Sequence, residues 1–288
     1  MKVYDFNTLI FGILNSKKIH IVRDIQLKAP LRIKISNIKI YGNNHCFYDN
    51  EINILGNNNT IKNLKIYSSP KCGIKISGNN NTLVSVIAMG CKRTGIQICN
   101  GGSKNKIINC YSGYNDSNTG DADGFACKLN CGKGNIFIFC QAWHNEDDGF
   151  DLFAAGDSVK LIGCESYYNN GSGFKLGGFK SEEDLRPKIH HKLIDCLSIG
   201  NGNYGFSNNN QVGKITLKNC RANYNKKEDY FFPRISHPKN KSELRLGDSF
   251  LINCMLLNTT KFNIESTKKI KWKLGKWRKL YVNRYFFL

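Results

Sequence analysis

Between about residues 37 and 258, short apolar runs alternate with polar turns that are rich in asparagine. Each unit begins with Gly-Ile or Gly-Phe. Spacings of 22, 29, 25, 24 and 32 residues separate the six clearest glycines, Gly73, Gly95, Gly124, Gly149, Gly173 and Gly205. Within a unit the second and fourth residues are mostly apolar and the third is mostly polar. This period of two predicts short strands, and their regular recurrence predicts a solenoid.

A second strand in each unit carries an apolar residue or a cysteine at one equivalent place: Leu64, Val86, Cys110, Cys140, Cys164, Cys196 and Cys220. Because cysteine replaces aliphatic residues there, we expect free thiols packed in the core. Five residues after each of the last five of these positions stands an asparagine: Asn115, Asn145, Asn169, Asn201 and Asn225. Asparagine at a repeated turn can bond to the next coil, so this pattern predicts an asparagine ladder.

These patterns together predict an all-β chain that forms a parallel β-helix of about eight to ten coils. A leucine-rich repeat has a similar period, but its longer outer segment and its leucine signature are not apparent here. We expect residues 1–36 to hold an N-terminal cap and the first strands. Residues 37–266 should form the β-helix, and residues 267–288 a basic, aromatic tail or cap.

The composition narrows the class of protein. Hydrophobic residues make up 41% of the chain and aromatic residues 11%, which excludes disorder over most of its length. A net charge of +20 favours a polyanionic partner. No apolar run is long enough for a membrane span, and the run from Thr8 to Leu14 is too short for a signal peptide, so we expect neither. Cys127 and Cys131 lack a second pair at zinc-site spacing, which favours buried thiols over a metal site.

Four aspartates are expected to share one small patch. Equivalent residues of adjacent coils in a β-helix lie roughly 4.8 Å apart, so sequence register predicts proximity. Asp123 and Asp148 each directly precede the glycine that opens a unit, so they occupy the same position on neighbouring coils. Asp147 adjoins Asp148, and Asp151 is the outward third residue of the same unit.

Carboxylates this close repel each other and raise each other's pKa unless a cation joins them. Other units carry the neutral residues Thr94, Ser172 and Tyr204 at the position of Asp123. The acidic patch therefore suggests Ca²⁺, which accepts several carboxylates with flexible geometry, whereas Mg²⁺ resists a cage of protein oxygens. A solvated acidic turn is the alternative. Asp121 and Glu146 also share a register, and at most they support the patch from outside it.

Lys175 is the outward third residue of the next unit, so we expect it to stack on Asp151. The common outcome of such stacking is a salt bridge between coils. Beside Ca²⁺, however, the added positive charge would lower the pKa of Lys175, and a neutral amine can accept a proton. A metal on an acid group with a base nearby is what the removal of a proton α to a carboxylate requires.

The sequence resembles the family 9 polysaccharide lyases, which are pectate lyases with a right-handed parallel β-helix. Three ordered blocks carry the resemblance: Ala-Asp-Gly-Phe-Ala-Cys-Lys-Leu at 122–129, Trp-His-Asn-Glu-Asp-Asp-Gly-Phe-Asp-Leu-Phe at 143–153 and Gly-Phe-Lys-Leu-Gly-Gly at 173–178. A weaker match at 205–210 extends it over about residues 73–225. The resemblance implies that Ca²⁺ is bound by Asp123, Asp147, Asp148 and Asp151. It also implies that Lys175 is the Brønsted base of a β-elimination on polygalacturonate.

The resemblance further implies an acidic polysaccharide as partner and an extracellular place of action. We expect a monomer that does not bind nucleic acid. Two alternatives remain open: a polyuronate C5-epimerase, which abstracts the same proton, and a non-catalytic β-helix that binds acidic glycans. The insertion at 179–188 follows the predicted base and would reshape its surroundings.

The C-terminal segment from Thr267 to Leu288 contains eight Lys or Arg residues, several aromatic residues and no acid. We expect it to cover the open end of the solenoid. Binding to nucleic acid or to an anionic membrane surface is the alternative for such a composition.

Overall fold

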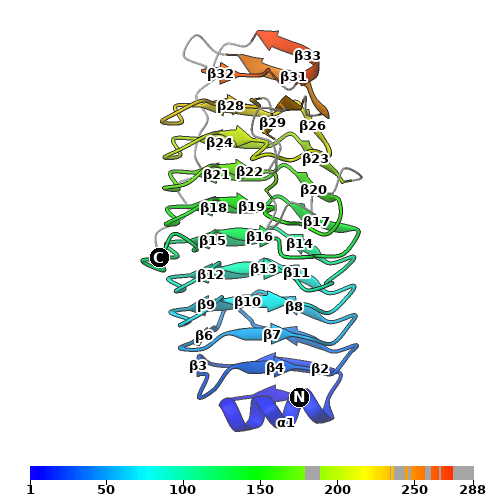
Figure 1. The fold of residues 1–288 in the computed structure, drawn as a ribbon. Helices are drawn as coiled ribbons and strands as arrows, with labels where there is room; N and C mark the ends of the chain where they lie inside the picture. Colours follow the sequence, from blue (N-terminus) through cyan, green and yellow to red (C-terminus); the bar gives the residue numbers. More distant parts are fainter. Residues whose placement is uncertain are drawn as a thin grey trace.

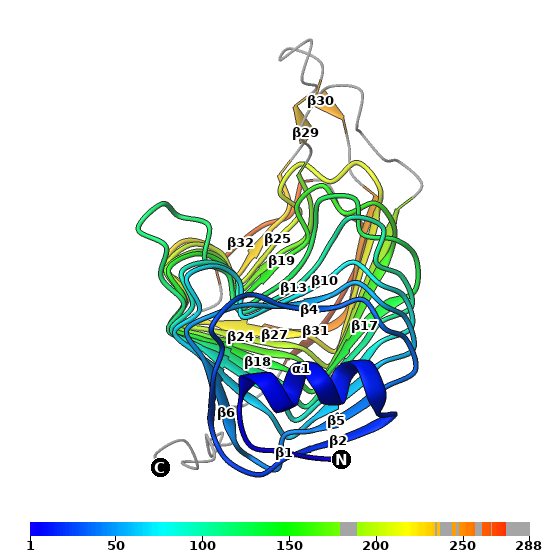
Figure 2. The same cartoon turned by 90° about the horizontal axis from the view of Figure 1, so that it is seen from below.

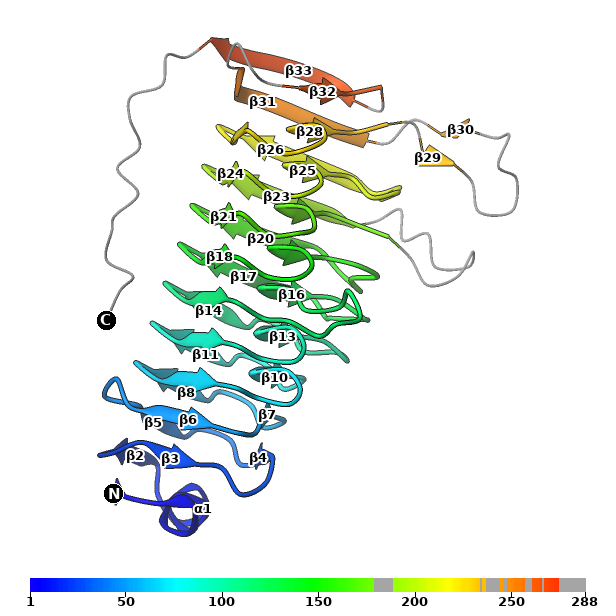
Figure 3. The same ribbon diagram turned by 90° about the vertical axis from the view of Figure 1, so that its left-hand side faces the viewer.

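The computed structural model describes residues 1–178, 189–233, 235–236, 244–245, 248–256, 261–265 and 267–274. In this part of the chain the strands form successive coils of a right-handed parallel β-helix, as predicted (Figure 1). Seen end-on, a 10-stranded sheet closes one side and a 21-stranded sheet folds around the rest (Figure 2). Figure 3 shows the coils from the side, from β2 and β3 at the N-terminal end to β31 and β33 at the other.

The 10-stranded sheet takes one short strand from each of ten coils: β4 (Leu31–Ile33), β7 (Ile52–Ile54), β10 (Ile74–Ile76), β13 (Ile96–Ile98), β16 (Phe125–Cys127), β19 (Phe150–Asp151), β22 (Phe174–Lys175), β25 (Phe206–Ser207), β28 (Tyr230–Phe231) and β32 (Phe262–Asn263). Every pairing in this sheet is parallel. Predicted strands on this face therefore stand one above another in register.

The 21-stranded sheet consists of two rows that meet at β31. The first row contains β1 (Lys2–Val3), β2 (Lys18–Ile21), β5 (Lys39–Tyr41), β8 (Thr60–Lys62), β11 (Thr82–Val84), β14 (Lys106–Ile108), β17 (Asn135–Ile138), β20 (Val159–Ile162), β23 (His190–Ile194), β26 (Lys214–Lys218), β31 (Asp248–Leu256) and β33 (Thr267–Leu274). The second row contains β3 (Ile25–Gln26), β6 (Cys46–Tyr48), β9 (Lys65–Tyr67), β12 (Ile87–Met89), β15 (Tyr111–Gly113), β18 (Gln141–Trp143), β21 (Glu165–Tyr167), β24 (Leu197–Ile199) and β27 (Arg221–Asn223). A separate antiparallel pair is formed by β29 (Ile235–Ser236) and β30 (Leu244–Arg245).

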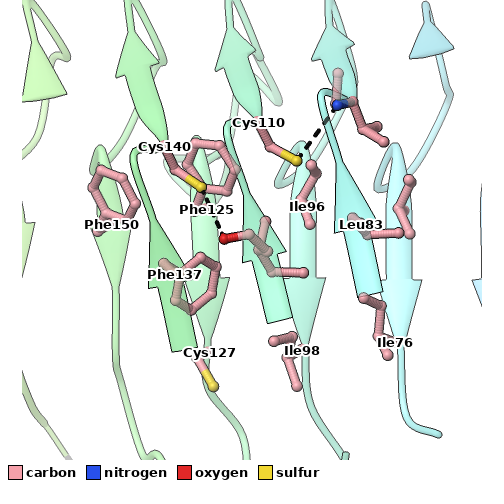
Figure 4. Close-up of a cluster of buried hydrophobic side chains, with 14 of the residues drawn as sticks. Ile76, Leu83, Ile96, Ile98, Cys110, Phe125, Cys127, Phe137, Cys140 and Phe150 are labelled. Atoms are coloured by element: carbon pink, nitrogen blue, oxygen red, sulfur yellow. Dashed lines mark hydrogen bonds between the residues drawn. The ribbon is translucent and has the colours of Figure 1, made fainter. Parts of the chain in front are cut away.

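The core is a set of side-chain stacks, because a parallel sheet in register places equivalent residues one strand spacing apart. Phe125, Phe150, Phe174 and Phe206 form one such stack, with successive ring centroids 5.0, 4.8 and 4.8 Å apart. Figure 4 shows its first rings, Phe125 and Phe150, facing the residues of the opposite sheet across the core. These rings are fully buried or nearly so, which confirms the prediction that the second residue of each unit faces inward.

Cysteine side chains form a second stack beside the aromatic one (Figure 4). All twelve cysteines are free and buried, as the repeat predicted. Cys140 Sγ, for example, lies 3.4 Å from the carbonyl oxygen of Ile107 on the neighbouring coil. Cys127 and Cys131 belong to the same core, which confirms that their thiols are buried.

The predicted asparagine ladder is present at the turns. Each amide Nδ2 donates to the Oδ1 of the next asparagine, at 2.7 Å from Asn115 to Asn145 and from Asn145 to Asn169. The series continues at 2.9 Å through Asn201 to Asn225. A second ladder, in which the backbone N–H donates to the side chain one coil on, joins the four residues Asn59, Asn81, Asn105 and Asn135. These ladders satisfy buried polar groups along the coil axis.

A helix that the sequence patterns did not predict, α1 (Phe6–Asn15), lies across the N-terminal end of the solenoid (Figures 1 and 2). It starts with a capping box between Asp5 and Thr8, and it buries Leu9 and Ile13. At the other end, β33 continues the sheet beyond residue 266 to residue 274. The rest of the basic tail, 275–288, and the insertion at 179–188 lie outside the described residues. Among those described, no helix is long and apolar enough to cross a membrane.

Candidate functional site

The candidate site lies on the 10-stranded sheet where β16, β19 and β22 are neighbours (Figure 1). Asp151 on β19 is the register partner of Lys175 on β22, as predicted. The coil position before these strands is also in register, because Gly124 N–H donates to the Asp148 carbonyl at 2.9 Å and Gly95 N–H to that of Asp123 at 3.0 Å. Asp123 and Asp148 therefore occupy equivalent places on adjacent coils.

Three of the four predicted aspartates converge. Asp123, Asp148 and Asp151 each offer a carboxylate oxygen, and these oxygens lie within 4.8 Å of one another. The three residues are buried, with exposed fractions of 0, 2 and 2%. Asp147 is half-buried and is not part of this triad. The Asp147 and Asp148 carboxylates nevertheless both lie against the backbone of Gly171. A Cβ added at Gly171 would lie 2.6 Å from Asp148 Oδ1 and 2.8 Å from Asp147 Oδ1.

Each carboxylate of the triad is held by the framework at one oxygen. Asp123 Oδ2 accepts a hydrogen bond from the Thr94 hydroxyl at 3.0 Å. Asp148 Oδ1 accepts one from the Ser172 backbone N–H at 2.6 Å. Asp151 Oδ1 accepts one from the Phe153 backbone N–H at 2.9 Å. Thr94 and Ser172, the neutral residues at the equivalent position of the neighbouring coils, thus each donate a hydrogen bond to an aspartate of the triad.

Two of the remaining oxygens are buried without a well-directed donor. Among the described residues, neither Asp123 Oδ1 nor Asp148 Oδ2 accepts a hydrogen bond of good geometry. Asp148 Oδ2 has the Lys175 ammonium 2.9 Å away, but Asp123 Oδ1 has no such partner among the described residues. A buried, unsatisfied carboxylate oxygen is costly, and it calls for a ligand with positive charge. Ca²⁺ binds oxygens at about 2.3–2.6 Å, so two ligands on opposite sides of the ion are about 5 Å apart. The triad is of that size and is made of hard oxygen donors, so these residues fit a Ca²⁺ ion.

Lys175 reaches the same cluster from the next coil. Its Nζ lies 2.9 Å from Asp148 Oδ2 and 3.6 Å from Asp151 Oδ1, and its side chain is 23% exposed. Lys175 Nζ and Asp148 Oδ2 form an ion pair. Nζ also lies 5.8 Å from the centre of the Phe153 ring. Of the two lysines that the described residues place at the triad, Lys175, the predicted base, is the more exposed.

Lys128, which directly follows β16, is a member of the site that the sequence analysis missed. Its Nζ lies 2.7 Å from Asp123 Oδ2, 3.0 Å from Asp151 Oδ2 and 3.2 Å from Asp121 Oδ1. The side chain is only 6% exposed. Lysine is almost never buried without a partner, but Lys128 lies beyond the strand positions that the two-residue period covers. The sequence did offer one signal for Lys128, its place inside the first of the three blocks that resemble the lyase family, 122–129.

The electrostatics are those of a crowded acidic cluster. Burial, and then the charge of Asp151, raise the pKa of Asp123 well above its usual range. Burial also raises the pKa of Asp148, and it raises that of Asp147 to about 7 with the help of Asp148. Burial works to lower the pKa of Lys175, but the Asp151 and Asp148 carboxylates outweigh it and hold that pKa above its ordinary value. Without a metal, therefore, Lys175 is an ammonium ion rather than the neutral amine expected beside Ca²⁺.

Asp121 and Glu146, the two acidic residues expected outside the patch, make different contacts. Asp121 contacts Lys128 and, at 3.6 Å, the exposed Arg93. Glu146 instead binds the loop that leads to Asp121: its carboxylate accepts hydrogen bonds from the backbone N–H groups of Ser117 and Gly120 at 2.9 and 3.0 Å. Asp121 thus touches the cluster through a lysine, and Glu146 only anchors the neighbouring loop.

Comparisons with known proteins agree with this fold. Pectate lyase L of Paenibacillus polymyxa (strain SC2) is 31% identical over 254 residues, which are 82% of this chain and 50% of that protein. Pectate lyase L of Dickeya chrysanthemi is 32% identical over 201 residues, 64% of this chain and 44% of that protein. The chain therefore spans about half the length of these relatives. The crystal structure of pectate lyase Pel9A superposes with a TM-score of 0.73 at 22% identity, covering 90% of this chain and 72% of that one.

The family model described as "Pel9A-like, right handed beta helix region" matches residues 15–240, which include every residue of the candidate site. This match confirms the resemblance seen in the three sequence blocks. The chain therefore belongs to the Pel9A-like right-handed β-helix family, that of the family 9 polysaccharide lyases.

Proposed function

We propose that this chain is a Ca²⁺-dependent pectate lyase that cleaves polygalacturonate by β-elimination. The observation that carries the proposal is the contact of one partly exposed amine, Lys175 Nζ, with a buried triad of carboxylates in a member of this family. Two relatives of the chain are named pectate lyases, which supports the same substrate class. The chain's charge of +20 suits an acidic polymer.

Asp123, Asp148 and Asp151 would hold the ion, with Asp147 as a fourth ligand from the edge of the triad. When bound, Ca²⁺ would neutralise these carboxylates and the uronate carboxylate of the substrate, which makes the C5 proton more acidic. The framework contacts at Thr94 and Ser172 keep two of the carboxylates from turning away. The site is thus organised before the substrate arrives.

Lys175 has the role of Brønsted base in this proposal. Its Nζ takes the C5 proton, and the electrons of the C5–H bond form a double bond between C4 and C5 as the C4–O bond breaks. The leaving oxygen then takes a proton from water or from the Lys175 ammonium, so that charge and atoms balance. Lys175 must be neutral to act, so its ion pairs with Asp148 and Asp151 have to be relieved in the active state.

The substrate also suggests where the enzyme works. Polygalacturonate is a polymer outside the cell, so an extracellular place of action is part of the proposal. We further propose that the chain acts as a monomer. Size-exclusion chromatography with light scattering tests the second point, and fractionation of the producing culture tests the first.

Product analysis tests the proposed reaction. Purified protein is incubated with polygalacturonate in Ca²⁺, and the products are followed by ultraviolet absorbance and mass spectrometry. A lyase yields unsaturated oligogalacturonides that absorb in the ultraviolet. Intact chains with inverted sugars would instead identify a C5-epimerase, and bound but unchanged chains would identify a glycan-binding β-helix. Either of these two results would contradict the proposal.

A matched pair of variants locates the chemistry. Lys175→Gln removes the amine, and Lys106→Gln removes an exposed lysine of β14 on the other sheet. We expect the first variant to lose activity by about 100-fold or more, the usual contribution of a positioned base, and the second to keep it. Full activity of Lys175→Gln would assign the base elsewhere.

A further inference from the structure

We infer that Lys128 is a built-in counter-cation of the acidic cluster, which positions two of its carboxylates and keeps the cluster folded when no metal is bound. This inference rests on the metal site of the proposed function, and it assigns a role to a residue outside that site's predicted ligands and base. It starts from the burial of Lys128, whose side chain is 6% exposed although it carries a charge. A buried charge needs a partner, and this one has three.

Lys128 leaves one oxygen of each of its two buried carboxylate partners for a metal. Lys128 Nζ holds Asp123 at Oδ2, at 2.7 Å, and leaves Asp123 Oδ1 buried and without a donor among the described residues. On Asp151 it holds Oδ2 at 3.0 Å, while the backbone of Phe153 holds Oδ1. The ammonium therefore leaves Asp123 Oδ1 open to a cation, and on Asp151 it leaves Oδ1, which already accepts a hydrogen bond from Phe153 and can still take a second partner.

The charges also balance with Lys128 included. The four aspartates of the patch, Asp123, Asp147, Asp148 and Asp151, bring four formal negative charges, and Lys128 and Lys175 bring two positive ones. Asp121, the third partner of Lys128, is also paired with Arg93 at 3.6 Å, so this outer pair is counted outside the cluster. The remaining charge of −2 is the amount that one dication neutralises. Without Lys128 the metal-free cluster would hold three uncompensated negative charges, two of them on carboxylates that are fully or almost fully buried.

A packing role alone predicts a different behaviour. A lysine that only fills space would cost the same stability with and without metal when replaced. Replacing a counter-cation costs more stability in the metal-free protein than in the Ca²⁺-bound protein, because Ca²⁺ supplies the missing positive charge. Its removal also takes a positive charge away from the ion's surroundings, so Ca²⁺ should bind more tightly to the variant.

The test compares Lys128→Met with the wild type by thermal unfolding, once in chelator and once in saturating Ca²⁺. We expect Lys128→Met to lose at least about 5 °C in chelator and to recover at least half of that loss in Ca²⁺. Calorimetric titration should show Ca²⁺ binding at least about fivefold tighter than in the wild type. Lys106→Met, on an exposed lysine, should change neither quantity. Equal losses in both conditions, or unchanged or weaker Ca²⁺ binding, would overturn the inference.

A double variant keeps the test decisive if Lys128→Met does not fold. Combining it with Asp151→Asn removes one negative charge along with the positive one, and we expect the double variant to fold and to unfold in chelator above Lys128→Met. A double variant that is as unstable as the single one would overturn the inference. If the wild type bound no Ca²⁺, the proposed function would fail, and the comparison of the two variants in chelator would still decide the role of Lys128.

Discussion

Lys175 Nζ lies 2.9 Å from Asp148 Oδ2, and this is the shorter of the two contacts that join the proposed base to the proposed metal site. The two residues come from adjacent coils, so the contact depends on the register of the solenoid rather than on a loop. In the metal-free protein it holds Lys175 as an ammonium, with its pKa raised by Asp151 and Asp148. The same contact therefore keeps Lys175 protonated and paired in the metal-free protein, and it holds the amine beside the proposed metal site.

Replacing Lys175 in two ways separates its charge from its basicity. Lys175→Arg keeps a cation beside Asp148 but cannot give up a proton near neutral pH, whereas Lys175→Gln removes both properties. We expect both variants to lose at least about 100-fold in lyase rate. Only Lys175→Gln should also be less stable in chelator. Initial rates and thermal unfolding measure the two effects, and an active Lys175→Arg would argue against the role of base.

Asp123→Asn should abolish Ca²⁺ binding without weakening the metal-free fold. Asp123 is fully buried, and burial with the charge of Asp151 raises its pKa, so its ionised form is a cost in the absence of metal. An asparagine keeps one oxygen for Thr94 and Lys128. We expect an unfolding temperature in chelator equal to or above that of the wild type. We also expect no stabilisation by Ca²⁺, where the wild type gains about 2.7 kcal/mol at 100 times its Kd. A variant that Ca²⁺ still stabilises would remove Asp123 from the site.

Gly171→Ala should weaken Ca²⁺ binding by displacing two carboxylates. The added Cβ would lie 2.6 Å from Asp148 Oδ1, 2.7 Å from the backbone carbonyl carbon of Asp147 and 2.8 Å from Asp147 Oδ1, distances at which these groups must move. Gly202→Ala is the control, since the three atoms nearest to its Cβ all belong to the backbone of Asn170, with the carbonyl oxygen at 2.2 Å. Calorimetry should show a loss of about tenfold or more in Ca²⁺ affinity for Gly171→Ala. Equal affinities in the two alanine variants would mean that the carboxylates near Gly171 do not bind the ion.

Acid should destabilise the fold through His191, away from the acidic cluster. His191 is fully buried; its Nδ1 accepts a hydrogen bond from the Val159 backbone N–H at 3.2 Å, and its Nε2 lies 3.4 Å from the side-chain amide nitrogen of Gln211. Burial, with a smaller effect of His190, lowers its pKa from 6.5 to about 3. Because the unfolded chain takes up this proton first, the folded state loses stability as the pH falls from about 6.5 towards 3.

The loss from this single proton is at most about 1.4 kcal/mol per pH unit. His191→Asn keeps a hydrogen-bonding side chain that does not titrate. The free energy of unfolding of this variant should therefore fall less steeply than that of the wild type between pH 6.5 and 4, as measured by urea unfolding. Parallel slopes for the two proteins would show that His191 is not buried as a neutral ring.

The fold was predictable because a parallel β-helix repeats its chemistry at each coil. The inward second residue, the thiol stack and the asparagine ladder all appear as equivalent positions in the sequence, and one register assignment places them together. The same register brings Asp151 against Lys175. Helix α1 does not repeat, so the periodic pattern could not predict it, although Asp5 and Thr8 form its capping box.

The site was predictable only in part, because register places backbone positions and not the ends of long side chains. Register predicted that Asp123, Asp147, Asp148 and Asp151 share one small patch, and three of them, Asp123, Asp148 and Asp151, converge. It could not show that Asp147 stands at the edge. Nor could it show that Lys128 reaches back to Asp123, since five residues and a flexible side chain separate the two. The ammonium state of metal-free Lys175 likewise depends on distances that register does not contain.

The most direct test of the account is the initial rate at which the metal-stripped wild-type protein forms unsaturated product from polygalacturonate, measured as Ca²⁺ is added back. We predict no detectable product in chelator and a rate that rises with Ca²⁺ to saturation, over the concentration range in which calorimetry detects binding. Product formation at an undiminished rate in chelator, or no unsaturated product at any Ca²⁺ concentration, would contradict the account.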